Sequence, residues 1–105
     1  MSAENFFAAA PKCTVVEVED YEGVYARELS AGEKDIWEKN FGKDDVRTRT
    51  VILCVCDANG NRVLNTKDHK KKVADLPVTY IDAVLEAFKK ANHLDAEEAK
   101  GIEKE

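Results

Sequence analysis

Long apolar runs are missing from this 105-residue chain, and none approaches the ~20 residues that a membrane-spanning helix needs. Residues 1–10 contain an apolar stretch that begins at Phe6, but it is short and is preceded by Glu4 and by no Lys or Arg. A secretory signal has a basic start and a longer apolar stretch, which excludes that interpretation. We therefore expect a protein that has no membrane partner and stays in the cytoplasm.

Cysteine is scarce, and its spacing excludes the usual disulfide and metal frameworks. There are 3 cysteines, an odd number, and Cys54 and Cys56 lie too close together for an easy bridge. Zinc sites usually present cysteine pairs with about two to four intervening residues, which this pair does not have. No spaced partner accompanies Cys13, His69 or His93. We therefore expect no bound metal and, for Cys54, a buried thiol that packs as a small hydrophobic group.

The motifs of common catalytic sites are also absent. The chain has no nucleophile elbow and no phosphate-cradling loop, since its 5 glycines are scattered singly. Asp57, Asn59 and Asn61 alternate as in a calcium-binding loop. Such a loop requires Gly at its sixth position, but Gly60 is at the fourth position counted from Asp57. The twelfth and last position usually holds Glu, but in this chain it is Asp68. We expect a turn here, and no catalytic residue, cofactor or enzyme activity.

Charge is segregated along the chain. The net charge is −5, which argues against sequence-independent binding to nucleic acid. Residues 1–45 carry 5 basic and 11 acidic side chains (net −6), residues 46–72 carry 7 and 2 (net +5), and residues 73–105 carry 4 and 8 (net −4). The positive segment 46–72 is either a solvated face or a basic patch that meets the acidic ends of a partner or of another copy. The second interpretation predicts weak self-association through this segment. Its basic residues are Arg47, Arg49, Arg62, Lys67, Lys70, Lys71 and Lys72.

A β-hairpin is indicated after a short N-terminal arm. Residues 1–12 read as a flexible arm that Pro11 ends. Residues 13–19 are rich in β-branched side chains in partial alternation, and residues 24–29 read as the returning strand. The turn between them ends at Gly23, which readily adopts a positive φ.

Capping signals and apolar spacing indicate two helices. Ser30 followed by Glu33 is a capping box, in which each side chain accepts a hydrogen bond from the other residue's backbone amide. It predicts a helix over 31–41 that stops at Gly42, a residue favoured just beyond helix ends. Pro77 suits the first turn of a second helix. The apolar stripe of that helix has helical spacing and consists of Val78, Ile81, Val84, Leu85 and Phe88.

The segment over 46–56 supports two interpretations. Its β-branched residues favour a strand by propensity. A helix here would need burial in the tertiary structure to offset the cost of residues such as Thr48, Thr50 and Val51. Because periodicity alone cannot assign an apolar run of this length, the residues themselves leave the choice open.

The order of motifs in the second half of the chain is more informative than any one of them. An apolar segment, a turn, a helix start and a helix end follow one another at 51–56, Asp57-Ala58-Asn59-Gly60, Leu76-Pro77 and Ala91-Asn92. This order resembles the tail assembly chaperones of long-tailed bacteriophages. The resemblance implies a buried helix over 46–56 and an α+β fold, mostly helical, in which an N-terminal β-hairpin packs beside three or four α-helices.

The resemblance also implies a function without catalysis. Tail assembly chaperones bind the tape measure protein before the tail tube forms around it, keep its apolar surface from aggregating, and are absent from the finished virion. The expected partners are the tape measure protein, the major tail tube protein and other copies of this chain, in the cytoplasm of the bacterial host. One domain is expected over 13–95, with a frayed tail over 96–105. Two alternatives are a small structural virion protein such as a head–tail connector, and a bacterial adaptor for another partner.

A partner-binding surface is expected around Trp37 and Phe41. The two residues lie four apart on one helix face, and aromatic anchors supply the most buried area per residue at an interface. The alternative is that both are core residues. Basic side chains nearby would steer the protein toward acidic positions of a tape measure helix. The basic residues expected in this role are Arg47, Arg49, Lys70, Lys71 and Lys72.

Overall fold

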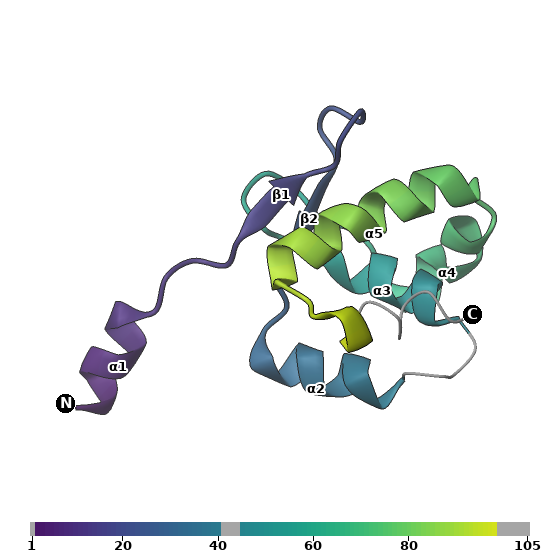
Figure 1. Ribbon diagram of the computed structural model, residues 1–105. Coiled ribbons are helices and arrows are strands. Elements are labelled where there is room, and N and C mark those ends of the chain that lie inside the picture. The colour runs from purple at the N-terminus through teal and green to yellow at the C-terminus, as the bar shows by residue number, and fades with distance from the viewer. Residues whose placement is uncertain (1, 41–44, 99–105) are drawn as a thin grey trace.

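The computed structural model of the protein describes residues 2–40 and 45–98 (Figure 1). A 3-stranded antiparallel sheet, in the order β1-β2-β3, is combined with helices that make up the larger part of the chain. The predicted α+β fold with an N-terminal hairpin is therefore confirmed. The elements in chain order are α1 (Ala3–Ala9), β1 (Val15–Glu17), β2 (Tyr25–Arg27), α2 (Ala31–Lys39), α3 (Val46–Cys54), β3 (Val55–Cys56), α4 (Thr66–Ala74) and α5 (Val78–Asn92).

The predicted hairpin is formed by β1 and β2, which pair antiparallel with Val16 opposite Ala26. Gly23 has φ +83° in the connecting turn, and its amide donates to the Glu17 carboxylate. The sequence did not predict β3, a strand of only 2 residues that pairs with β2 through Val55 opposite Ala26. It arises because the apolar run leaves the helix at its last turn and continues extended.

The helix α2 begins with the predicted capping box. The Ser30 hydroxyl accepts from the Glu33 amide at 3.2 Å, and the Glu33 carboxylate accepts from the Ser30 amide at 2.9 Å. These bonds satisfy backbone amides that have no partner within the first helical turn. The helix extends to Lys39, and the predicted stop at Gly42 lies outside the described residues.

The segment that propensity left open is helical from Val46 to Cys54, as the resemblance implied. Burial explains why: Val51 and Ile52 are 3% and 1% exposed, and Thr50 is fully buried. The Thr50 hydroxyl also donates to the Val46 carbonyl at 2.6 Å, so its polar group is satisfied inside the helix. Tertiary packing therefore outweighs the unfavourable helix propensity of the β-branched side chains.

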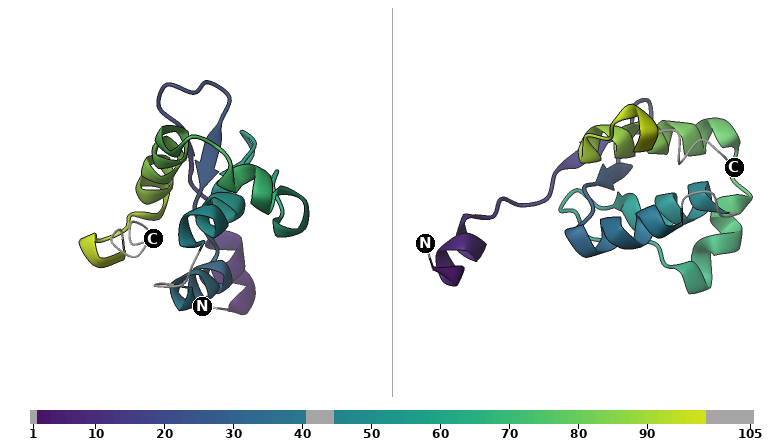
Figure 2. Two further views of the ribbon diagram at one scale, coloured as in Figure 1. Left: turned by 90° about the vertical axis from the view of Figure 1, so that its right-hand side faces the viewer. Right: turned by 60° about the horizontal axis from the view of Figure 1, so that its bottom comes forward.

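The core lies where α5 packs against β1, β2 and α3, an arrangement visible in both views of Figure 2. Four of the five residues of the predicted stripe are buried, whereas Val78 is 54% exposed because it stands at the free start of the helix. At the other end, the Asn92 side chain accepts from the Leu29 amide at 2.8 Å and donates to the Arg27 and Phe88 carbonyls. This amide fixes the end of α5 against the segment that follows β2.

The arm predicted for residues 1–12 contains a helix that the sequence did not predict. The helix α1 is capped by the Ser2 hydroxyl, has no buried residue and stands apart from the body at the end of an extended segment (Figure 1). Toward the other terminus, residues 96–98 are helical, and the Glu98 amide donates to the Asp95 carboxylate at 2.8 Å. The rest of the predicted tail lies outside the described residues.

The predicted turn at 57–60 depends on Gly60, so replacing Gly60 with Ala is expected to lower the free energy of unfolding by about 1–3 kcal/mol. Gly60 has φ +85°, and a Cβ atom there would lie 3.0 Å from the Cys13 sulfur and 3.4 Å from Val15 Cγ2. Gly32→Ala is the matched control, because Gly32 lies within α2 and a Cβ atom there meets nothing within 4 Å. Urea unfolding of both variants should show destabilisation for Gly60→Ala alone, and equal stability would contradict the strain assigned to Gly60.

Candidate functional site

Trp37 is a core residue, and the prediction that it anchors a partner is therefore wrong. Its side chain is 1% exposed, its ring packs edge-on against Phe88 at 5.2 Å, and its indole N–H donates to the Thr50 hydroxyl at 2.8 Å. A ring enclosed in this way between α2, α3 and α5 has no surface left for a partner. Phe41, the second expected anchor, lies outside the described residues.

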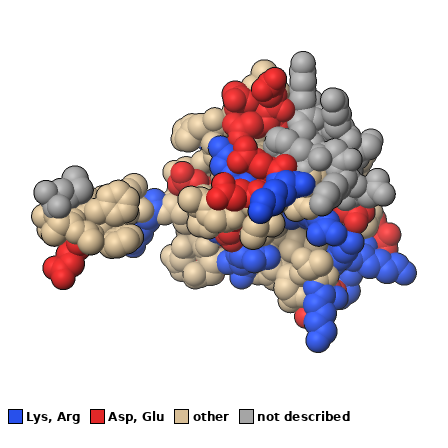
Figure 3. All heavy atoms as spheres, turned by 90° about the horizontal axis from the view of Figure 1, so that it is seen from below, with Lys and Arg blue, Asp and Glu red and all other residues tan. Residues whose placement is uncertain are grey.

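The expected basic residues lie on two neighbouring helices. Arg47 and Arg49 belong to α3 and the three lysines at 70–72 to α4, and α3 packs against α4. Arg49, Lys71 and Lys72 are exposed, Arg47 is half-buried, and Lys70 forms a 2.9 Å ion pair with Asp45. On the face drawn in Figure 3, many Asp and Glu side chains gather in one patch and most Lys and Arg side chains lie on another side, with both kinds mixed at the border. The folding therefore keeps the charge segregation of the sequence in part.

Beside these basic residues the surface is hollowed by an apolar groove of about 230 Å³. Side chains from α3, β3, α4, α5 and the segment before α4 line it, and most of them are aliphatic. His69, Lys72 and Tyr80 are its polar members. We use the name apolar groove for the hollow lined by Val51, Val55, Leu64, His69, Lys72, Val73, Leu76, Tyr80 and Val84.

A smaller hollow of about 130 Å³ shares Val73 and Leu76 with the apolar groove, and Arg47 and Val78 are among its other lining residues. Two large hydrophobic side chains that line these hollows are exposed: Leu76 (40%) and Val78 (54%). Exposed apolar side chains that gather near a hollow and a rim of one charge are typical of interaction surfaces. This side of the molecule is the best candidate for a binding site.

Local sequence explains why Leu76 is exposed at this place. The helix α4 starts at the Asn65 cap, whose side chain accepts from the Asp68 amide at 2.7 Å, and ends at Ala74. Pro77 then fixes the backbone at φ −57° and starts α5 in a new direction. Leu76 therefore sits at the corner between two helices, where neither helix covers it.

His69 is half-buried and lines the apolar groove. Its Nδ1 accepts from the Asn65 amide at 2.9 Å. That bond fixes the ring beside the first turn of α4. The residue is thus a part of the groove wall and of the helix cap at once.

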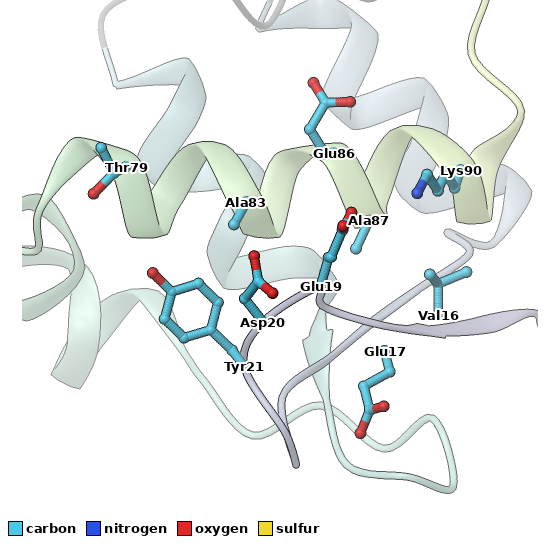
Figure 4. Close-up of a pocket in the computed structure, with 10 residues that line it drawn as sticks. All are labelled: Val16, Glu17, Glu19, Asp20, Tyr21, Thr79, Ala83, Glu86, Ala87 and Lys90. Carbon is cyan, nitrogen blue, oxygen red and sulfur yellow. The ribbon is translucent and has the colours of Figure 1, made fainter.

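A larger hollow of about 340 Å³ lies between the hairpin turn and α5, and acidic residues line much of it (Figure 4). The carboxylates do not converge: Glu17 is directed away from α5 and accepts from the Gly23 amide, and Glu86 pairs with Lys89 at 3.0 Å. Tyr21 packs edge-on against Tyr80 at 4.8 Å beside it. Within residues 2–40 and 45–98, no three His, Cys, Asp or Glu side chains are grouped so that they would hold a metal ion.

The thiols are placed for packing. Cys54 is fully buried, as predicted, and Cys56 is 3% exposed. Burial raises the pKa of the Cys54 thiol far above its ordinary value and that of Cys56 to about 11. Both therefore stay protonated at neutral pH and are poor nucleophiles. Cys13 is exposed and free.

No family model matches the chain, and no curated protein or solved structure matches it either. Of the helices in the described part of the chain, none has both the length and the apolar character needed to cross a membrane.

Proposed function

We propose that the protein is a tail assembly chaperone of a long-tailed bacteriophage, which binds the tape measure protein without catalysis and keeps it soluble while the tail tube assembles. The order of motifs in the second half of the chain supports this proposal. So does the helix at Val46–Cys54, which the resemblance implied against local propensity. On this proposal the protein acts in the cytoplasm of the bacterial host and is absent from the mature virion.

The observation that carries the proposal is the apolar groove with basic side chains beside it. A chaperone for a helical protein must cover apolar helix faces, and an amphipathic helix binds to a partner by placing its apolar face in such a groove. Leu76 stands exposed at the helix corner, and Lys72 lines the same hollow. The groove replaces Trp37 as the proposed contact with the tape measure protein.

The positive charge beside the groove favours one kind of client helix. Lys72, in the groove wall, presents positive charge where the client helix docks, and exposed Arg49 and Lys71 lie on the same two helices, α3 and α4. Positive side chains at the edge of an interface raise the rate of encounter with acidic segments more than they raise affinity. A client helix with acidic residues on its polar face is therefore favoured.

The size of the groove suits a client that must be released. Stable interfaces bury roughly 1,200–2,000 Å² in total, and smaller ones belong to transient complexes. A hollow of about 230 Å³ holds one or two side chains of a client helix. Several copies of the chaperone would then cover a long tape measure protein, each by a contact weak enough for the tail tube to displace.

Leu76→Asp is expected to abolish recovery of the complex when the chain is co-expressed with the tape measure protein. The substitution places a charge in the apolar groove, where a client side chain would desolvate it. Because Leu76 is 40% exposed, the helical circular dichroism signal should stay unchanged. Ile36→Asp is the matched control, since Ile36 is 59% exposed on α2, does not line the groove and should leave the complex intact.

A complex that survives Leu76→Asp would place the contact elsewhere on the chain. A tape measure protein that is soluble in the absence of this chain would remove the chaperone function itself. Detection of the chain in purified virions by mass spectrometry would favour the structural alternative, a head–tail connector. A gene neighbourhood without tail genes would favour the bacterial adaptor.

A further inference from the structure

The N-terminal helix α1 presents apolar side chains that the body does not cover. Phe6 and Phe7 are 62% and 72% exposed, their rings contact each other edge-on at 5.2 Å, and no residue of α1 is buried. An aromatic side chain buries about 150–250 Å² when it is covered, so leaving two adjacent ones in water is unfavourable. The exposure of this pair points to an interaction that covers it.

In the structure, α1 lies away from the chain's own apolar groove. Both Figure 1 and the right-hand view of Figure 2 place α1 and α4 at opposite ends of the molecule, whose longest extent is 47 Å. In this arrangement the Phe pair stays exposed and is free to enter the apolar groove of another copy.

The groove and the arm match in size. An apolar cavity of about 150 Å³ is sufficient to bind benzene. The apolar groove, at about 230 Å³, therefore accommodates one phenyl ring with room for adjacent atoms of the helix. Leu76, at the edge of the groove, offers an exposed contact for the second ring.

They also match in charge. Glu4 is the sole charged side chain of α1, and it lies three residues before Phe7, which places the two on the same helix face. Lys72 is exposed and lines the groove. When Phe7 enters the groove, Glu4 therefore lies on the side of α1 that meets this basic residue.

We propose that α1 of one copy docks in the apolar groove of a second copy, with the Phe7 ring in the hollow and Glu4 beside Lys72. The contact covers the exposed aromatic pair of one copy and the open hollow of the other. It is too small for a permanent complex, so the copies exchange. If the groove also binds the tape measure protein, as the proposed function holds, the arm of a neighbouring copy shields the groove until the client displaces it.

Sedimentation velocity of the full chain at increasing concentration tests the proposal. The wild-type chain should self-associate, and the double variant Phe6→Ala/Phe7→Ala should raise the dissociation constant about tenfold or more. The association should persist at high salt, where attraction between exposed charges is screened. Because α1 contributes no buried residue, the variant should fold as the wild type does, which circular dichroism checks. Ile36→Ala, which removes another exposed apolar side chain, should change nothing.

Disulfide trapping locates the contact. In a Cys13→Ser background, chains with Phe7→Cys are mixed with separately tagged chains that carry Leu76→Cys. A mixed disulfide should form, and it should not form when Ile36→Cys takes the place of Leu76→Cys. A wild-type chain that stays monomeric, an association that the Phe substitutions leave unchanged, or equal trapping at position 36 would each overturn the proposal. These measurements use the chain alone, so their failure is distinct from a failure to bind the tape measure protein.

Discussion

Replacing Trp37 with Ala is expected to lower the free energy of unfolding by about 3–5 kcal/mol, the cost of removing a large aromatic side chain from a packed core. The ring is 1% exposed and packs against Phe88, and its N–H bonds to Thr50. Removing it leaves a cavity between α2, α3 and α5. Since domains of this size are stable by only about 5–15 kcal/mol, this loss removes a large part of the total stability.

Urea unfolding followed by far-ultraviolet circular dichroism measures this loss. The free energy of unfolding of Trp37→Phe should lie between those of Trp37→Ala and the wild type, because this variant keeps an aromatic ring but loses the hydrogen bond to Thr50. Ile36→Ala, next to Trp37 but 59% exposed, should change stability by no more than about 0.5 kcal/mol. A loss below about 1 kcal/mol for Trp37→Ala would falsify the assignment of this ring to the core.

This result bears on how binding experiments are interpreted. A Trp37 variant that no longer recovers the tape measure protein would report an unfolded chaperone rather than a missing contact. Substitutions at exposed positions of the apolar groove, such as Leu76, separate binding from folding. They are therefore the informative ones for the proposed function.

Elements with local signals could be predicted from the sequence. The capping box at Ser30 and the turn at Gly23 act within a few residues, and the structure contains both. The helix at Val46–Cys54 needed the resemblance, because its stability comes from burial against other elements and not from its own residues. The strand at Val55–Cys56 is too short to leave a pattern. The helix α1 has a signal that was missed, since Ser2 before an alanine-rich run is a favourable N-cap.

The candidate site could be predicted only in part. Charge segregation is a property of the chain and identified the basic residues. Helical spacing shows that two residues share a face, but not whether that face meets the core or solvent, and so Trp37 was expected at a partner-binding surface with the core as the alternative. The Leu76-Pro77 pair was recognised as a helix start. Its role in the groove depends on the angle between α4 and α5, which is set by tertiary packing.

The Arg27–Glu33 pair is expected to make stability depend on pH below the ordinary pKa of a glutamate. The Nη1 and Nη2 atoms of Arg27 donate to the Glu33 carboxylate, at 3.0 and 2.7 Å, and the Arg27 side chain is 10% exposed. The hydrogen bonds from Arg27 are the main reason why the pKa of Glu33 is lowered to about 2. A group with a depressed pKa in the folded state stabilises the protein above its unfolded pKa. This contribution should therefore be complete above about pH 5 and be lost as the pH falls toward 2.

Glu33→Gln should remove that contribution, lowering the free energy of unfolding at neutral pH by about 3 kcal/mol and flattening its dependence on pH between about 5 and 2. The loss is large because Arg27 keeps its charge in a mostly buried position, where its guanidinium still donates to the Leu53 carbonyl at 2.9 Å but has lost the carboxylate. Glu38→Gln is the matched control, since Glu38 is an exposed carboxylate on the same helix. Urea unfolding at about pH 7 and about pH 3 should show the difference between the two chains narrowing in acid, because at about pH 3 the carboxylate is protonated in the unfolded wild type but still mostly ionised in the folded one. A difference between wild type and Glu33→Gln that stays constant across this range would show that the ion pair does not contribute to the pH dependence.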